Sequence, residues 1–158
     1  MSEEIKDAEF RGLFLGEGYI SIVRIKRYPK GKIVFNYRPQ LSLSQRLDNR
    51  QMIDWIKNRY GGHIWIAKNI KSRFVGINMS QAAFWTTTNS HEALKICKIL
   101  EKSSIPSKKL TDVKLVKRYC EWKVKMAKRK NTPKEKQFCE KIYQLCKENH
   151  KFGNGVTL

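Results

Sequence analysis

FRGLFLGEG, residues 10–18, combines three glycines and an acidic residue with apolar Leu and Phe side chains. Gly12 and Gly16 are four residues apart, so in a helix they lie on the same face. Glycine in a helix interior costs about 1 kcal/mol relative to alanine, and small residues at this spacing let another helix approach closely. Glu17 follows between two glycines, where a carboxylate can bind a hard cation through oxygen. The alternative from spacing alone is an ordinary amphipathic helix with a glycine-rich end and a solvated Glu17.

The rest of the chain predicts an α+β fold. The first helix is expected over residues 8–16, with Asp7 as its N-cap. After it we expect a hairpin of strands over 19–26 and 33–45 with a turn at 29–31, and then a helix over 48–60 stopped by Gly61-Gly62. A second hairpin follows, with strands over 63–68 and 73–79 around a polar tip at 69–72, and then an edge strand over 84–88. The remaining helices are expected over 90–102, after Pro106 and from Pro133. The order is α-β-β-α-β-β-α with extra C-terminal helices.

The chain length of 158 residues suits a single domain, residues 1–158. Its core is expected over about 8–120 and a C-terminal helical extension over 121–150, with a loose tail from residue 152. No apolar run approaches the roughly 18 residues that a membrane span needs, and the charged N-terminus has no signal-peptide core. We therefore expect an intracellular protein with no membrane partner.

The charge of the chain indicates a polyanionic partner. It has 33 Lys and Arg against 14 Asp and Glu, a formal net charge of +19. Phosphates relieve the self-repulsion of such a chain, and the counterions they release favour binding. Nucleic acid is the expected partner, and a merely basic protein or a membrane-surface binder is the alternative.

The 4 cysteines contain no CxxC pair, and the 3 histidines do not add metal-ligand spacing to them. A structural zinc site is therefore not expected. Cys97 and Cys120 fall on the apolar faces of predicted helices, where they should be reduced core residues.

The sequence FRGLFLGEGYISI resembles the motif helix and following strand of the LAGLIDADG homing endonucleases. Arg11 replaces a small residue of the motif, and Leu15 stands where the family often has a first acid. This sequence agrees with the family motif at Gly12, Leu13-Phe14, Gly16, Glu17 and Gly18.

A second stretch supports the resemblance. QLSLSQRLDNRQMIDWIKNRYGG, residues 40–62, is similar to the family's second strand, polar Gln and glycine-ended helix. The family's element order is also the order predicted above. The resemblance covers about residues 8–120 and implies a DNA endonuclease.

The resemblance implies a set of catalytic residues. Glu17 would bind the metal, Mg²⁺ or another divalent cation such as Mn²⁺, with the backbone carbonyl of Gly16 completing the shell. Gln45 would orient water. The family's basic residue would be Lys108 or Lys109, although the register there is open and solvated lysines are the alternative.

A single copy of the motif implies a homodimer, since chains of the family with two copies act as monomers. The expected interface residues are Gly12, Leu13 and Gly16, in a two-fold contact. Two Glu17 carboxylates would then lie side by side, where like charges resist joint ionisation unless cations separate them. The target would be near-palindromic double-stranded DNA, with one cut in each strand and no small-molecule substrate.

DNA reading is expected on the polar face of the two hairpins, in the major groove. Some of these side chains would touch only phosphates, as would the basic run over 125–136, unless that run is a solvated loop. The expected contacts are Tyr19, Ser21, Arg24, Lys26, Arg38, Gln40, Ser42, Lys68, Asn69, Lys71 and Arg73.

Two other functions use the same fold. An RNA maturase helps an intron splice, and its basicity would be no different. A non-cutting DNA-binding regulator would keep the scaffold, but it has no need of Glu17. The Lys, Ile and Asn content favours an AT-rich genome, such as that of an organelle. The resemblance implies intron homing, in an organelle or a prokaryotic cytoplasm.

Overall fold

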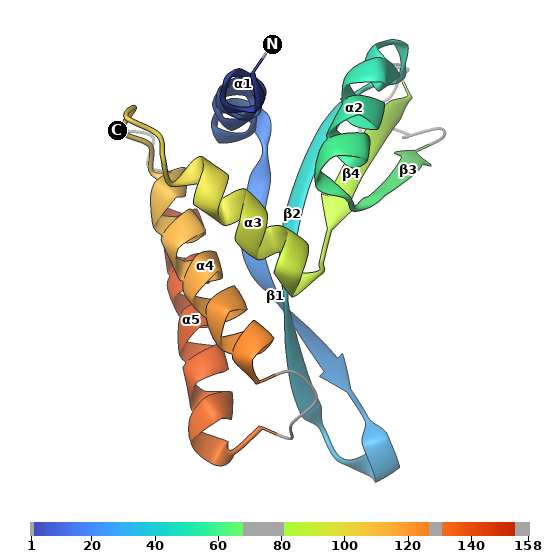
Figure 1. Ribbon diagram of the computed structural model, residues 1–158. Helices are drawn as coiled ribbons and strands as arrows, with labels where there is room; N and C mark the ends of the chain where they lie inside the picture. The colour runs from blue at the N-terminus through green and yellow to red at the C-terminus, as the bar shows by residue number, and fades with distance from the viewer. Residues whose placement is uncertain (1, 68–80, 127–130, 154–158) are drawn as a thin grey trace.

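The computed structural model describes residues 2–67, 81–126 and 131–153. The helices and strands in these ranges, labelled in Figure 1, are α1 (Glu3–Glu17), β1 (Tyr19–Arg27), β2 (Val34–Arg46), α2 (Arg50–Tyr60), β3 (His63–Ala67), β4 (Ala82–Thr87), α3 (Ser90–Leu100), α4 (Lys109–Lys125) and α5 (Pro133–Gly153). Short 3₁₀ turns at Pro29–Gly31 and Leu47–Asn49 precede β2 and α2. The predicted α+β class and the order α-β-β-α-β-β-α followed by helices are confirmed.

The described strands form one antiparallel sheet in the order β1-β2-β4-β3. β1 pairs with β2 along its whole length, whereas β4 reaches only the part of β2 from Leu41 to Arg46. Residues 34–40 of β2 therefore pair with β1 in a two-stranded ribbon. In Figure 1 this ribbon extends away from α1, with α4 and α5 alongside the hairpin.

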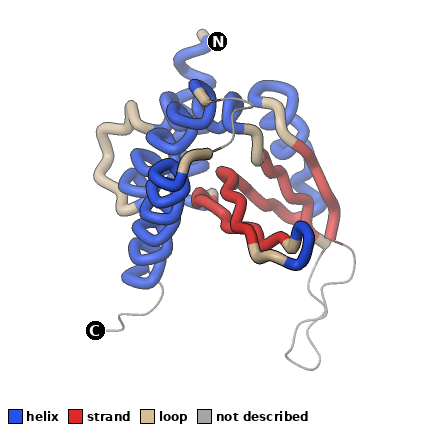
Figure 2. The backbone as a smooth tube through the Cα atoms, turned by 90° about the horizontal axis from the view of Figure 1, so that it is seen from below, coloured by secondary structure: helices blue, strands red, loops and turns tan. Residues whose placement is uncertain are grey.

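In the part of the chain that the structure describes, the helices cover one face of the sheet and leave the other open. In Figure 2 they gather around one side of the strands. Ile22 of β1, Leu41 and Leu43 of β2 and Trp85 of β4 point to this side, and each is at most 2% exposed. They pack with Phe14 of α1 in the core, which is what positions the end of α1 against the sheet.

α1 begins earlier than the sequence predicts. The N-cap is Ser2, whose side chain accepts a hydrogen bond from the Ile5 amide, and acidic residues in the first turn favour the positive end of the helix dipole. Asp7 lies inside the helix instead. It accepts hydrogen bonds from Arg59 at 2.8 Å and Tyr60 at 2.7 Å, which join α1 to the end of α2.

The prediction that the strand over residues 84–88 lies at the edge of the sheet is wrong. β4 lies inside the sheet, between β2 and β3, and so provides the second strand of the second hairpin. The strand expected over 73–79 and the tip at 69–72 lie outside the described residues. Gly61-Gly62 ends α2 as predicted: both have positive φ, of 81° and 88°, which glycine adopts without strain.

The four cysteines are buried in the core, which confirms the prediction for Cys97 and Cys120. Burial raises the pKa of Cys120 to about 12, so this thiol stays protonated at neutral pH. Among the described helices, none has the length and apolar character required to cross a membrane.

Candidate active site

The motif carboxylate lies at the exposed end of α1, beside the end of β2. Gln45 Nε2 donates a hydrogen bond of 2.6 Å to Glu17 Oε2. Gln45 Oε1 accepts a second hydrogen bond, of 3.2 Å, from Asn49 Nδ2 at the N-cap of α2. The structure thus brings together two predicted site residues that are 28 positions apart, and adds Asn49, which the sequence reasoning missed.

Lys109, the first residue of α4, directs its amine at the same end of α1. Lys109 Nζ donates hydrogen bonds to the carbonyls of Leu15 at 3.0 Å and Phe14 at 3.3 Å, where a cation opposes the negative end of the helix dipole. Burial lowers the pKa of Lys109, while the Asp112 carboxylate acts in the opposite direction. Of the two lysines that the sequence left open, Lys109 therefore lies at the motif helix, and Lys108 is the exposed N-cap of α4.

Two of the motif glycines have no packing reason within the chain. A Cβ atom added at Gly12 or Gly16 would meet nothing within 4 Å, and both glycines are exposed. A Cβ at Gly18, by contrast, would lie 2.7 Å from the ring and the carbonyl of Phe14. Gly18 is needed for packing inside the chain, whereas Gly12 and Gly16 form an open strip on α1, which we call the glycine face.

The glycine face is flanked by apolar surface. On one side the loop over residues 103–107 forms a groove with it, and Ile105 of that loop is 72% exposed. On the other side Leu13 lies with Trp55 of α2, which is 38% exposed. Exposed apolar groups that gather around a helix in this way mark a surface suited to another protein.

The donors at the end of α1 fit a hard cation. Within the described residues, no three His, Cys, Asp or Glu side chains are grouped as a metal site. Mg²⁺ does not need such a cage, because it binds through one or two carboxylates, waters and substrate phosphates. The exposed Glu17 carboxylate at the carbonyl end of α1 supplies oxygen donors of the kind that Mg²⁺ prefers.

The end of α5 braces the start of α4, the helix that carries Lys109. His150 Nε2 lies 2.9 Å from Oδ2 of the buried Asp112, and Asn149 Nδ2 donates to the carbonyl of Lys108 at 3.4 Å. The Tyr19 ring packs edge-on against His150, with 5.5 Å between the ring centroids. This end of α5 therefore fixes the surroundings of the candidate site.

The strand register assigns the predicted DNA contacts to faces. Arg38 is exposed on the open face, and Ser21 is only 5% exposed although it lies opposite Gln40. The predicted residues on this face are Tyr19, Ser21, Arg38, Gln40 and Ser42. Lys68, Asn69, Lys71 and Arg73 lie outside the described residues.

The prediction that Arg24 and Lys26 lie on the open face is wrong. Arg24 pairs with Tyr37 on the helix-covered side, where its Nη1 forms an ion pair of 2.7 Å with Glu140 of α5. Lys26 has the same strand parity and lies over the Tyr28 ring. The β-branched run of β1 leaves the alternation ambiguous in the sequence, and only the pairing with β2 resolves it.

The open face also carries an aromatic pair that the sequence reasoning missed. The Trp65 and Phe84 rings are stacked 4.0 Å apart and nearly parallel, and Trp65 is 50% exposed. Phe84 pairs with Ser44 of β2, the residue before Gln45, so the pair lies near the candidate site. The alternation His63, Trp65 in β3 was the available signal.

The chain is similar in sequence to one protein family and in fold to several solved structures. The sequence model of the LAGLIDADG endonuclease family matches residues 10–120. No curated protein sequence matches the chain. The homing endonuclease I-CvuI in complex with the I-CreI target has a TM-score of 0.65 and 14% identity, over 98% of this chain and 86% of that chain. The archaeal intron-encoded I-Vdi141I complexed with DNA has a TM-score of 0.62 and 18% identity, over 95% and 85%. The LAGLIDADG homing endonuclease I-LtrWI bound to target DNA has a TM-score of 0.67 and 15% identity, over 91% and 45%.

At these identities the solved structures establish a shared fold. The match to the family's sequence model establishes family membership, because it spans most of the sequence and includes the motif and the whole described sheet. The candidate-site residues Glu17, Gln45 and Lys109 all fall within the matched range. The chain belongs to the LAGLIDADG endonuclease family.

Proposed function

We propose that the chain is a site-specific DNA endonuclease that uses a divalent metal and acts as a homodimer. The contact between Glu17 and Gln45 carries the proposal, because it joins a carboxylate and an amide at the exposed end of the motif helix. Lys109 adds a cation at the same place. A protein that only binds nucleic acid has no need of this combination, and the solved structures of similar fold include complexes with DNA.

Each residue of the proposed site has a separate role in phosphodiester hydrolysis. Mg²⁺, or Mn²⁺ in its place, would be held by the Glu17 carboxylate and the Gly16 carbonyl, and when bound it polarises the phosphate and acidifies water. Gln45 fixes the direction of the carboxylate and offers its amide to water, while Asn49 holds that amide from the other side. Lys109 stabilises negative charge that develops on the phosphate oxygens.

The glycine face is the proposed dimer contact. Glycine is unfavourable in a helix unless another backbone approaches, and among the residues that the structure describes no atom lies within 4 Å of a Cβ added at Gly12 or Gly16. A two-fold contact there, with Leu13 and Ile105 at its borders, brings two Glu17 side chains together. Each carboxylate then serves one DNA strand, and the target is close to a palindrome.

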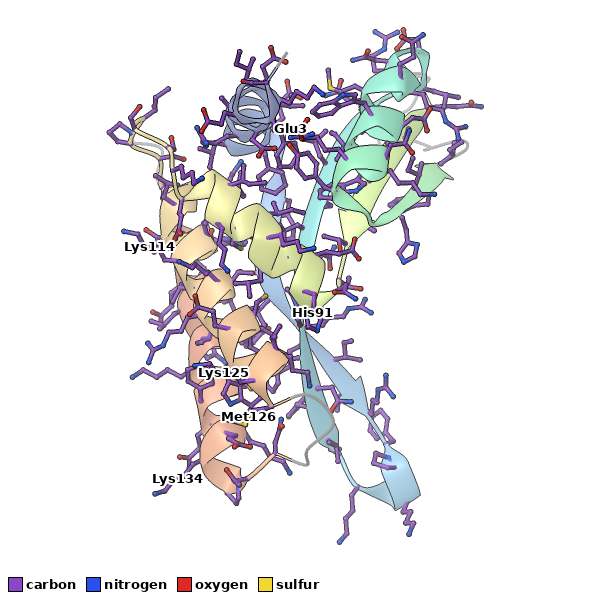
Figure 3. The ribbon with its side chains drawn as sticks, in the orientation of Figure 1. Glu3, His91, Lys114, Lys125, Met126 and Lys134 are labelled. Carbon is purple, nitrogen blue, oxygen red and sulfur yellow. The ribbon has the colours of Figure 1, made fainter. Side chains whose placement is uncertain are left out.

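The open face of the sheet is the proposed reading surface. Arg38, Gln40 and Ser42 supply donors and acceptors for base edges in the major groove. The stacked pair of Trp65 and Phe84 supplies an apolar patch, whose natural contact in that groove is the 5-methyl group of thymine. Basic side chains on the outer side of the helices, where Figure 3 shows Lys114 and Lys134 pointing away from the sheet, add to the net charge without reading bases.

The experiment that tests this function selects cleaved sequences from random duplex DNA, with Mg²⁺ and with a chelator. We expect double-strand cuts at a near-palindromic site in Mg²⁺ and none in the chelator. Specific binding without cuts would indicate a regulator. Binding to structured RNA without cuts in DNA would indicate a maturase. Either result would overturn the proposal.

A further inference from the structure

Glu140 of α5 joins both strands of the β1–β2 ribbon, and it lies beyond the residues that the family model matches. Glu140 Oε1 pairs with Arg24 Nη1 at 2.7 Å, and Oε2 accepts a short hydrogen bond from the Tyr37 hydroxyl. Arg24 and Tyr37 are directly opposite each other in β1 and β2. Gln144, one turn further along α5, donates to Oε1 at 2.8 Å and holds the carboxylate in place.

Aromatic rings also hold the Arg24 side chain in place. The Arg24 guanidinium lies over the Phe35 ring at 4.5 Å and over the Tyr143 ring at 4.7 Å, so a residue of β2 and a residue of α5 enclose it. Tyr119 of α4 donates its hydroxyl to the Tyr37 carbonyl at 2.7 Å. Two helices thus fix one pair of opposite strand residues.

The Glu140 carboxyl is charged in this setting. Burial raises its pKa, but hydrogen bonds from Tyr37 and Gln144 and the Arg24 charge outweigh that effect, so the pKa lies below its usual range. An ionised acceptor makes stronger hydrogen bonds than a neutral one, which strengthens its hold on both strands.

The ribbon needs this support because it has only two strands. β4 pairs with β2 no further than Leu41, and an isolated two-stranded hairpin is marginally stable in water. Arg38, next to Tyr37 in β2, projects from the opposite, open face. A strand rises by about 3.3 Å per residue and DNA by about 3.4 Å per base pair, so a small displacement of the ribbon moves Arg38 towards a different base.

We propose that Glu140 is a positioning residue for DNA recognition: through Arg24 and Tyr37 it holds the ribbon in the register in which its open face reads the base pairs far from the cut. This inference rests on the proposed function. Val23, opposite Arg38, lies four residues after Tyr19, the first residue of β1, which is about 13 Å along the strand and corresponds to about four base pairs. Recognition near the cut, where β2 is held by both neighbours, does not depend on Glu140.

The test compares Glu140→Ala with Tyr37→Phe, which removes a single hydroxyl, and with Glu148→Ala, which removes the same charge from an exposed position of α5. Cleavage is measured on a panel of targets with single base-pair changes. We expect Glu140→Ala and Tyr37→Phe to lose at least about fivefold discrimination at the outer base pairs. Discrimination near the cut, and the single-turnover rate on saturating target, should match those of Glu148→Ala.

Hydrogen exchange of the free protein provides a readout that does not depend on cutting. We expect faster amide exchange in residues 34–40 of Glu140→Ala and Tyr37→Phe, with no change in β3 and β4. Exchange and outer discrimination equal to those of Glu148→Ala would overturn the inference, as would a loss spread evenly over all positions. If the parent protein cuts no DNA, the proposed function fails, and the exchange result still decides whether Glu140 holds the ribbon.

Discussion

Gln45 donates a hydrogen bond of 2.6 Å to the Glu17 carboxylate, and so joins the end of β2 to the exposed end of α1. Asn49 holds the opposite side of the Gln45 amide at 3.2 Å. The amide therefore has one orientation, with its donor on the carboxylate and its acceptor on Asn49. This arrangement fixes the direction in which Glu17 presents its oxygens.

Gln45→Ala should lower the single-turnover cleavage rate by about 10- to 100-fold and raise the Mg²⁺ concentration needed for half-maximal rate, because it releases the carboxylate that we propose binds the metal. Gln51→Ala, at an exposed position of α2, is the matched control. Rates measured across a Mg²⁺ series check the prediction. An unchanged Mg²⁺ dependence would show that Gln45 has no part in holding the site.

Gly12→Ala should weaken the proposed dimer by at least about tenfold, because the added methyl group would separate two helices that pack closely in it. The isolated chain should fold no less stably, since the methyl meets nothing within 4 Å among the described residues and alanine favours a helix by about 1 kcal/mol. Gly18→Ala should instead lower the melting temperature, because its Cβ would collide with Phe14. Sedimentation equilibrium and thermal unfolding measure these effects. A Gly12→Ala protein that dimerises like the parent would rule out the glycine face as the contact.

Lys109→Met should reduce cleavage by about 100-fold, whereas Lys108→Met should have little effect. Burial lowers the pKa of Lys109, so its charge is lost at a lower pH than that of an ordinary lysine. Cleavage by the parent should therefore decline as the pH rises through this lowered pKa. Lys109→Arg, whose guanidinium stays charged, should lack the decline. Identical pH–rate profiles for the parent and Lys109→Arg would argue against a role for this charge.

Trp65→Ala should relax a preference for thymine near the cut. Replacing single thymines of the target by deoxyuridine removes the 5-methyl group and nothing else. We expect one or more such replacements to weaken cleavage by the parent by about fivefold or more, and to leave Trp65→Ala unaffected. If no replacement distinguishes the two proteins, the aromatic pair does not contact thymine methyl groups.

Asp7→Asn should destabilise the fold at neutral pH by about 2 kcal/mol, because Arg59 and Tyr60 lose an ionised acceptor. Burial raises the pKa of Asp7, but these hydrogen bonds outweigh it and hold the pKa below its ordinary value. The stabilisation is therefore complete above the pKa of the unfolded chain, about 4, and is lost as the pH falls through the lower folded pKa. Urea unfolding between pH 7 and pH 3 should show the two proteins converging in acid. Parallel curves would contradict this account.

Much of the fold follows from local sequence. The glycine-bounded motif, the alternation around Leu41 and Leu43 and the stop at Gly61-Gly62 each depend on short-range chemistry, so their elements were predictable. The position of β4 in the sheet could not be predicted, because β3 and β4 have similar lengths and neither sequence indicates which of them lies at the edge. Only pairing with β2 on one side and β3 on the other decides it.

The site was predictable to a similar degree. Glu17 and Gln45 came from motifs, and the structure brings them into contact. The choice of Lys109 over Lys108 depends on where α4 begins relative to α1, which no local pattern gives. Arg24 resembled a DNA contact because a basic residue in a strand has no visible partner until the distant Glu140 is placed beside it.

The most direct test of the central claim, that Glu17 is the metal-binding carboxylate of a DNA endonuclease, measures binding and cutting of the selected target by Glu17→Gln. The isosteric amide removes the charge that a divalent cation needs, so we predict binding similar to the parent and cleavage at least about 100-fold slower. Glu4→Gln, at an exposed position of the same helix, should cut like the parent. Cleavage by Glu17→Gln at the parent rate would contradict the account.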